Sequence, residues 1–286
     1  MINQKRQFSN LEEFINSSLS THQQLEIELA SSLQNCSNAQ SIKLELRSCQ
    51  NNDQNITFLS SAIASCTNIT KLFLLLENND IQEEGAKVLG LGISKCTNLL
   101  DLTIELKNNL ILEQGVQDLG SALSSCILLK NLSLNLINNF LGAQGASSLV
   151  SALKSCTKLQ NLELQIGYNY ICDSGMINLA SAQENYTFLQ NLILNIECNE
   201  IGDDDLSSLG SAFVKCTNMS TLTFFFSHNK ISETGLQSLS FNLAKCPLLS
   251  NLTLELRSNK ESESSKKRFR EQIMKLKRLV IRGIQF

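Results

Sequence analysis

The sequence predicts an α/β solenoid, a stack of short strand–helix units with a parallel β-sheet on one side and α-helices on the other. A unit of 30 residues recurs without an insertion from Cys36 to Asn259. In each unit, a segment with a two-residue apolar period precedes a segment with a three- to four-residue period. Units this short bury their apolar face only against their neighbours, so repetition in register predicts one stacked structural domain.

The first part of each unit predicts a strand. Leu102, Ile104 and Leu106 alternate with polar residues, as in a strand with one buried face. The same pattern predicts a ninth strand that ends with Ile284 and Phe286. The other strands are predicted to centre on Leu44, Leu74, Ile104, Leu134, Leu164, Leu194, Phe224 and Leu254.

The second part of each unit predicts an amphipathic helix. Leu119, Leu123 and Cys126 share one helical face. Strands pair ~4.8 Å apart and helices pack ~8–10 Å apart, so we expect a horseshoe with the sheet on its concave side and the helices on its convex side. The predicted helices are 54–65, 84–95, 114–125, 144–155, 174–185, 204–215 and 234–245.

Two polar or small residue types recur where strand and helix are joined. An asparagine recurs every 30 residues from Asn79 to Asn259, and its amide is expected to bond backbone groups of the neighbouring turn. A glycine recurs at Gly85, Gly115 and equivalent positions. It is expected to let the start of one helix approach the next unit closely.

The ends differ from the middle, so three segments are predicted within the one domain. Residues 1–40 are expected to form a helical N-terminal cap, residues 41–260 the repeats, and residues 261–286 a basic helix followed by the final strand. Residues 257–286 contain ten Lys and Arg against three acidic residues, a charge of +7, whereas the preceding 256 residues carry −10.

The repeat resembles the leucine-rich repeat family, in particular its longer, ribonuclease-inhibitor-like class. The matching residues are Leu99-x-x-Leu102-x-Ile104-x-Leu106-x-x-Asn109-x-Ile111, followed by the amphipathic helix. The resemblance implies a horseshoe fold. The Asn-, Gln-, Ser- and Leu-rich composition is also similar to repeat proteins of ciliated protists.

The ten cysteines do not predict disulfides or a metal site. Equivalent helix positions in successive units lie ~8–10 Å apart, beyond the ~7 Å Cα separation that a disulfide spans. The chain has no Cys-x-x-Cys pair and only two histidines, so zinc-ligand spacing is absent. We expect the periodic cysteines to be buried, and Cys172 and Cys198 to be the exposed thiols.

No residue pattern predicts catalysis or a cofactor. The run Asp203-Asp204-Asp205 falls on the predicted first turn of a helix, where acidic residues favour capping over cation binding. No phosphate-binding glycine loop is present. We therefore expect a protein that is not an enzyme and uses no cofactor, metal or small-molecule substrate.

The favoured function is a non-catalytic protein–protein interaction scaffold, and three sets of residues are candidate contacts. The first set lies on the concave face of the sheet: Phe73, Leu75, Ile193 and Phe225. The second is an apolar ridge that follows the recurring asparagine: Leu110, Phe140 and Tyr170. The third belongs to the basic C-terminal helix and would suit an acidic partner: Lys266, Lys267, Arg268 and Arg270.

Two alternatives remain open: a structural subunit of a large cytoskeletal or axonemal assembly, or an inhibitor or regulator of an enzyme such as a ribonuclease or a small GTPase. The N-terminal stretch MINQKRQFSN is polar, and no run approaches the ~18 apolar residues of a membrane span. We expect a cytoplasmic protein that does not bind membranes. If it is a subunit of a cytoskeletal assembly, we expect it to be associated with the cytoskeleton.

Overall fold

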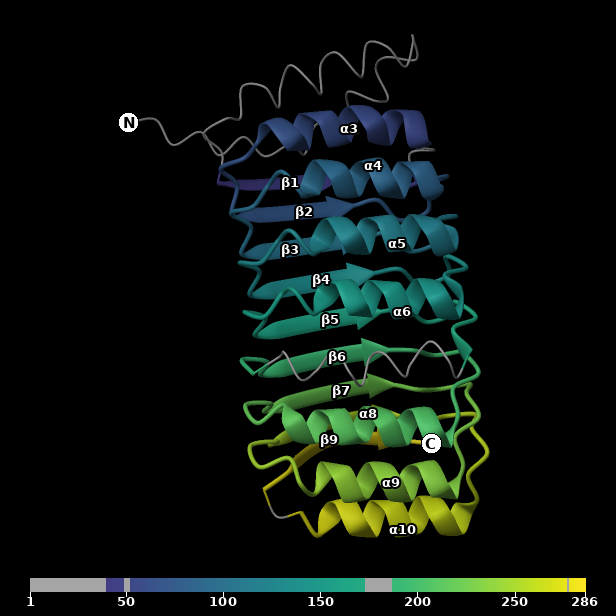
Figure 1. Cartoon of the computed structure of the whole chain (residues 1–286). Coiled ribbons are helices and arrows are strands. Elements are labelled where there is room, and N and C mark those ends of the chain that lie inside the picture. Colours follow the sequence, from purple (N-terminus) through teal and green to yellow (C-terminus); the bar gives the residue numbers. More distant parts are fainter. Residues whose placement is uncertain (1–39, 49–51, 173–186, 277) are drawn as a thin grey trace.

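The computed structural model describes residues 40–48, 52–172, 187–276 and 278–286. Nine strands form one open sheet in the order of the sequence, and every neighbouring pair is parallel (Figure 1). The strands are β1 (Ser41–Glu45), β2 (Lys71–Leu75), β3 (Asp101–Glu105), β4 (Asn131–Asn135), β5 (Asn161–Gln165), β6 (Asn191–Asn195), β7 (Thr221–Phe225), β8 (Asn251–Glu255) and β9 (Val280–Gln285).

The predicted strand register is confirmed. Leu102 pairs with Leu72 on one side and Leu132 on the other, an offset of one full unit in each direction. Ile284 pairs with Leu254, as the sequence predicts for the ninth strand, after a shift of register between Leu252 and Thr253. The horseshoe curvature stays a prediction.

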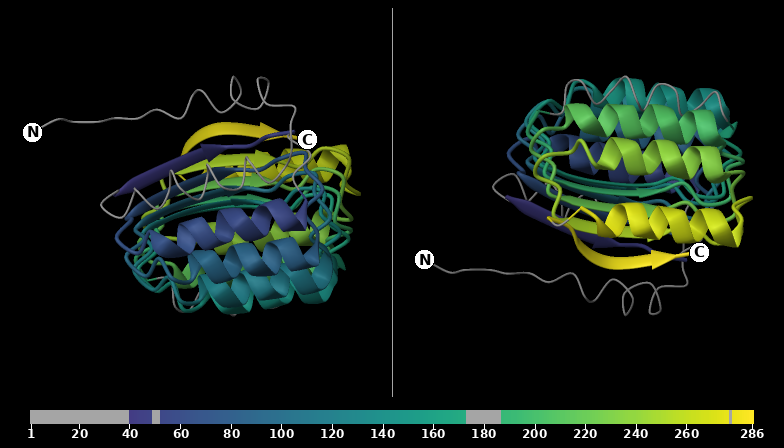
Figure 2. Two further views of the ribbon diagram at one scale, coloured as in Figure 1. Left: turned by 90° about the horizontal axis from the view of Figure 1, so that it is seen from above. Right: turned by 90° about the horizontal axis from the view of Figure 1, so that it is seen from below.

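The described helices pack side by side on one face of the sheet and leave its other face free of helices (Figure 2). Their predicted positions are confirmed to within about three residues, except that 174–185 and the cap over 1–39 lie outside the described residues. The helices are α3 (Asp53–Ser65), α4 (Glu83–Ile93), α5 (Leu112–Leu123), α6 (Gly142–Leu153), α8 (Asp203–Lys215), α9 (Glu233–Leu243) and α10 (Glu263–Met274).

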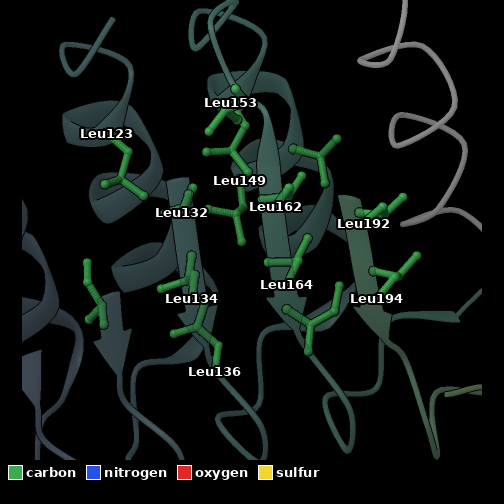
Figure 3. Close-up of a cluster of buried hydrophobic side chains, with 14 of the residues drawn as sticks. Leu123, Leu132, Leu134, Leu136, Leu149, Leu153, Leu162, Leu164, Leu192 and Leu194 are labelled. Carbon is green, nitrogen blue, oxygen red and sulfur yellow. The ribbon is translucent and has the colours of Figure 1, made fainter. Parts of the chain in front are cut away.

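The core lies between the sheet and the helices and is mostly aliphatic, with a few buried phenylalanines and cysteines. Leu132 and Leu134 of β4 and the following Leu136 meet Leu149 and Leu153 of α6, and all five are at most 2% exposed (Figure 3). Because the columns repeat, the same apolar layer continues from one unit to the next. No unit therefore has a core that is separate from those of its neighbours.

The recurring asparagine is buried and bonds backbone groups of its own and adjacent units. Nδ2 of Asn169 donates to the carbonyl oxygens of Leu136 (2.8 Å) and Ile166 (3.0 Å). Its Oδ1 accepts from the backbone N–H of Asn139 (2.8 Å) and Leu141 (3.3 Å). Each asparagine thus satisfies groups that leave the strand ladder, which confirms the predicted role.

The recurring glycine marks a close approach between successive units. A Cβ on Gly115 would lie 2.9 Å from the Cα of Glu83 in the preceding helix. A Cβ on Gly235 would collide with a carboxylate oxygen of Asp203. That same oxygen accepts the backbone N–H of Ser232 at 2.7 Å, so the aspartate fastens one helix start to the next unit.

In the last described unit, one position of the repeated core holds a residue of a different chemical type. The residue two places after the recurring asparagine is aliphatic and buried in earlier units, as Ile231 shows, but it is Glu261 here. The side chain of Glu261 is only 2% exposed and its Oε1 lies 3.7 Å from Nζ of Lys266. Its Oε2 has no hydrogen-bond partner. An ionisable group therefore occupies a place that the preceding units fill with isoleucine or leucine.

Candidate binding surfaces

The helix-free face of the sheet carries the first set of predicted contacts. Phe73, Ile193 and Phe225 are partly exposed there. The expectation that Leu75 is also exposed is wrong, because its side chain is only 8% exposed. The strand pairing places Leu75 between Glu45 and Glu105, so longer side chains stand on both sides of it.

An open trough of about 360 Å³ crosses this face from β2 to β6. Phe73 lies toward one end and Ile193 toward the other, four strands away. Between them, polar residues such as Thr103, Ser133 and Glu163 share the lining with atoms of Leu102, Leu132 and Leu162. The trough therefore joins two apolar ends through a hydrogen-bonding middle.

A ladder of side chains runs along the edge of the trough at the first residue of each strand. Asn191 donates to Asn161, Asn161 donates to Asn131, and Asn131 donates to the carboxylate of Asp101. Asp101 also pairs with Nζ of Lys71 at 2.7 Å. The ladder fixes the amide groups in one direction, so it presents an ordered row of donors and acceptors.

Carboxylates crowd the middle of the helix-free face. Oε2 of Glu163 accepts from the hydroxyl of Ser133 at 3.1 Å, and its other oxygen accepts from the side chain of Gln165. Burial raises the pKa of Glu105. A hydrogen bond from Asn135 opposes that shift, and the charges of Glu77 and Glu163 add to it. The middle of this face is therefore acidic.

The predicted ridge at the exit of the strands is confirmed as an exposed surface. Leu110, Phe140 and Tyr170 are 43%, 44% and 64% exposed. The rings of Phe140 and Tyr170 stack with centroids 6.0 Å apart and planes 16° apart. The structure adds two residues that the sequence analysis missed, Leu112 and Tyr168, which are 38% and 50% exposed. We call these five residues the strand-exit ridge.

Tyr168 could have been found in the sequence, because it stands where three preceding units carry asparagine. Asn138 donates to Asn108 at 3.0 Å and Asn108 to Asn78 at 2.7 Å, an exposed amide ladder that leads up to Tyr168. A hydrogen bond with Cys198 raises the pKa of the Tyr168 hydroxyl. The ridge is therefore bordered by an ordered row of polar side chains.

Side chains of the basic C-terminal helix make more contacts within the chain than the sequence predicts. Lys266 is only partly exposed: its side chain is 19% exposed and its Nζ lies 2.8 Å from Oε1 of Glu263. Arg268 pairs with Glu233 of α9, and the Arg270 guanidinium lies 4.8 Å from the centre of the Phe286 ring. Lys267 is exposed. The contacts of Arg268 and Arg270 tie α10 to α9 and β9.

Within the described residues, the cysteines of the repeated column are buried, as predicted. Burial raises the pKa of Cys96, Cys126 and Cys216 to about 12, so these thiols are protonated and unreactive at neutral pH. Cys172 is exposed and Cys198 is partly exposed. In the described part of the chain, no three His, Cys, Asp or Glu side chains gather in a way that could hold a metal ion.

The acidic run at the start of α8 serves the backbone. The carboxylate of Asp205 is 2% exposed and accepts the N–H of Gly202 at 3.1 Å. Asp203 bonds Ser232 of the next unit through both the backbone and the side chain of that serine. The predicted capping role is confirmed for Asp205, whereas the bonds of Asp203 join α8 to the next unit.

Together the strands and helices define a parallel α/β solenoid built from strand–helix repeats. Comparison with models of protein families finds no match to the chain, and comparison with curated proteins finds no significant similarity. Across the ranges that the structure describes, no helix has both the length and the apolar character needed to span a bilayer.

Proposed function

We propose that the protein is a non-catalytic scaffold that binds a partner protein through the helix-free face of its sheet. In this proposal it is a cytoplasmic member of the leucine-rich repeat class, of the ribonuclease-inhibitor-like type. The observation that carries the proposal is the trough between Phe73 and Ile193. Side chains on this face are not needed to fill the core, so their chemistry is available for recognition.

The form of the trough favours a polypeptide partner. Its apolar ends are four strand spacings apart, roughly 19 Å. This length suits a segment of polypeptide that lies across the strands. A partner side chain can pack against Phe73 or Ile193, while the amide ladder and Glu163 bond polar groups between them. The acidic middle favours a partner that places a basic residue there.

Affinity purification tests the proposal. The wild-type chain, the double variant Phe73→Ser/Ile193→Ser and the control Leu91→Ser would each be used as bait, with mass spectrometry of the recovered proteins. Leu91 is 55% exposed on α4, on the opposite side of the sheet, and is therefore a matched apolar control.

We expect a partner that wild type and Leu91→Ser recover equally and that the trough variant loses by about tenfold or more, equivalent to about 1.4 kcal/mol. Titration of the purified partner then gives the loss in affinity directly. Equal recovery by all three baits, with wild-type unfolding midpoints for each, would remove the trough from the function.

A further inference from the structure

We propose that the strand-exit ridge is a second docking surface, and that it takes one amphipathic helix of a partner protein with basic residues near both helix ends. The ridge lies beyond the ends of the strands, whereas the trough is lined by residues within them. The two surfaces can therefore be tested separately.

Backbone conformation sets the ridge apart from ordinary exposed apolar residues. Leu112, Phe140, Tyr168 and Tyr170 have φ of +56°, +58°, +58° and +56°, in the left-handed region. That region is unfavourable for bulky side chains and is readily adopted only by glycine and asparagine. Equivalent left-handed places in neighbouring units hold the favoured types at Asn138 and Gly142 and polar or small residues such as Glu200 and Cys172, whereas the ridge holds large apolar or aromatic side chains.

Neither the backbone nor the core accounts for the bulky side chains at these positions. All four are more than a third exposed, and asparagine or glycine would suit the turn better. A large apolar side chain held in an unfavourable backbone conformation and directed to solvent indicates a role in contact with another molecule.

The spacing of the ridge matches a helix better than an extended segment. Successive units are ~4.8 Å apart along the sheet, and the stacked rings of Phe140 and Tyr170 are 6.0 Å apart. Apolar residues that alternate between three- and four-residue steps on a helix recur about every 5.3 Å along its axis. Side chains on one face of an extended segment recur every ~6.7 Å. That repeat is longer than the spacing of the units, so the side chains of such a segment would not stay in register with the ridge over three units.

Exposed acidic residues around the ridge indicate that basic residues should flank the apolar stripe of the partner helix. The column that contains Phe140 has Asp80 at one side of the ridge and Glu200 at the other, both exposed. The exposed Glu113 lies in the first turn of α5, just after Leu112. Glu200 pairs with Lys230 at 2.7 Å, but both side chains are about half exposed, so the pair is weak and open to exchange.

The acids at the two sides of the ridge, Asp80 and Glu200, favour a partner helix with basic residues at its ends. They also disfavour binding of a second copy of this chain. Four unit spacings, roughly 19 Å, separate Asp80 from Glu200, which corresponds to about 13 residues of helix. Lysine or arginine residues that far apart would meet both acids. Antiparallel self-pairing centred on Phe140 would instead place Asp80 against Glu200, two like charges.

Three labelled peptides of about 17 residues test the proposal by fluorescence anisotropy with the full chain. The first is an amphipathic helix with leucines at three- and four-residue steps and lysines near both ends. The second replaces the lysines with glutamates. The third keeps the lysines and places a proline in the middle, which prevents the helix.

The chain is used as wild type and as three variants. Phe140→Asn/Tyr170→Asn removes the stacked rings and suits the left-handed turn. Asp80→Lys/Glu200→Lys reverses the charge at both ends of the ridge. Phe73→Ser/Ile193→Ser alters only the trough and serves as the matched control.

We expect the lysine-ended helix to bind wild type at least about tenfold more tightly than the other two peptides. The ring variant should lose about tenfold, the charge-reversed variant should prefer the glutamate-ended helix, and the trough variant should bind like wild type. Equal binding of the proline peptide overturns the helical occupant, and equal binding of the glutamate-ended peptide overturns the charge assignment. Unchanged binding by the ring variant, or no binding of any peptide, overturns the site.

Discussion

The amide oxygen of Asn169 holds the backbone on both sides of Phe140. It accepts the N–H of Asn139 at 2.8 Å and that of Leu141 at 3.3 Å, and the residue between them turns to φ +58° so that both N–H groups reach one atom. Leu110 lies at the same place one unit earlier, but its own N–H donates to the carbonyl of Ile81, and its φ is not in the left-handed region. The left-handed turn at Phe140 thus accompanies an asparagine oxygen that accepts the N–H groups on both sides of it, whereas the equivalent Asn139 accepts only the N–H of Ile111 beside Leu110.

Replacing Phe140 with asparagine should leave the protein as stable as wild type or more stable. Relief of the left-handed strain is worth about 1–2 kcal/mol, and loss of the exposed stack on Tyr170 costs about 0.5 kcal/mol. Urea unfolding measures the free energy of unfolding, with Leu110→Asn as the unstrained control. A loss above about 1 kcal/mol for Phe140→Asn would contradict the assigned strain.

Asn169→Ala should lower the free energy of unfolding by about 3 kcal/mol, because it leaves buried carbonyl and N–H groups without partners. The control is Asn98→Ala, whose exposed side chain donates to the carbonyl of Thr67 at 3.1 Å. That change should cost no more than about 0.5 kcal/mol. Similar losses for the two variants in urea unfolding would show that the buried amide of Asn169 contributes no more to stability than the exposed amide of Asn98.

Gly115→Ala should destabilise the chain by about 1–3 kcal/mol, because the new methyl group would meet the Cα of Glu83 at 2.9 Å. A backbone atom cannot yield as a flexible side chain does. Gly283→Ala is the matched control, since a Cβ at that position would have no atom within 4 Å and its φ is ordinary. Thermal unfolding should show a lower midpoint for Gly115→Ala only; a midpoint equal to wild type would mean that the units can separate freely.

Stability should fall as the solution becomes alkaline. The pKa of Cys126 is about 12 in the folded chain, against about 9 for an ordinary thiol, so the folded state holds this proton more tightly. Its contribution is fully present below about pH 9 and is lost as the pH rises from 9 toward 12. Cys126→Ala should flatten the decline in unfolding free energy above pH 9. A decline as steep as that of wild type would exclude this thiol as a source, and native-state thiol labelling should reach Cys172 before Cys126.

Glu261→Ile should raise the free energy of unfolding by about 1 kcal/mol, because it restores the aliphatic column and removes a buried charge. Lys266 keeps its pairing with Glu263 at 2.8 Å. Glu263→Gln, at the exposed end of that pair, should leave stability nearly unchanged, because solvent screens an exposed ion pair. Chemical denaturation compares the two, and a net loss for Glu261→Ile would mean that the buried carboxylate stabilises the end of the stack.

Much of the fold follows from the sequence because one period governs both the strands and the helices. The strand through Ile104 is centred one residue earlier than predicted, and α5 begins at Leu112 instead of residue 114. These are small shifts at element boundaries. The positions of Cys126 and Asn139 in the core also follow, since each occupies the same place in every stacked unit.

The candidate contacts are harder to predict because exposure depends on neighbours in other units. Leu75 alternates like an outward residue, yet longer side chains beside it leave it 8% exposed. Lys266 falls on the outer face of an amphipathic pattern, but Glu261 and Glu263 draw its ammonium group in. Tyr168 does not follow from apolar periodicity; the signal for it is the run of Asn78, Asn108 and Asn138 at the same place, which marks an exposed turn with left-handed φ.

The unbroken 30-residue register has a consequence for how such a protein can change. Any cut made at the same point in two units leaves every column continuous, so whole units can be exchanged, deleted or duplicated by recombination without rebuilding the core. Removing one unit between Leu110 and Phe140 would shorten the strand-exit ridge by one step. New binding surfaces can therefore arise in this array by shuffling entire units, as well as by point mutation.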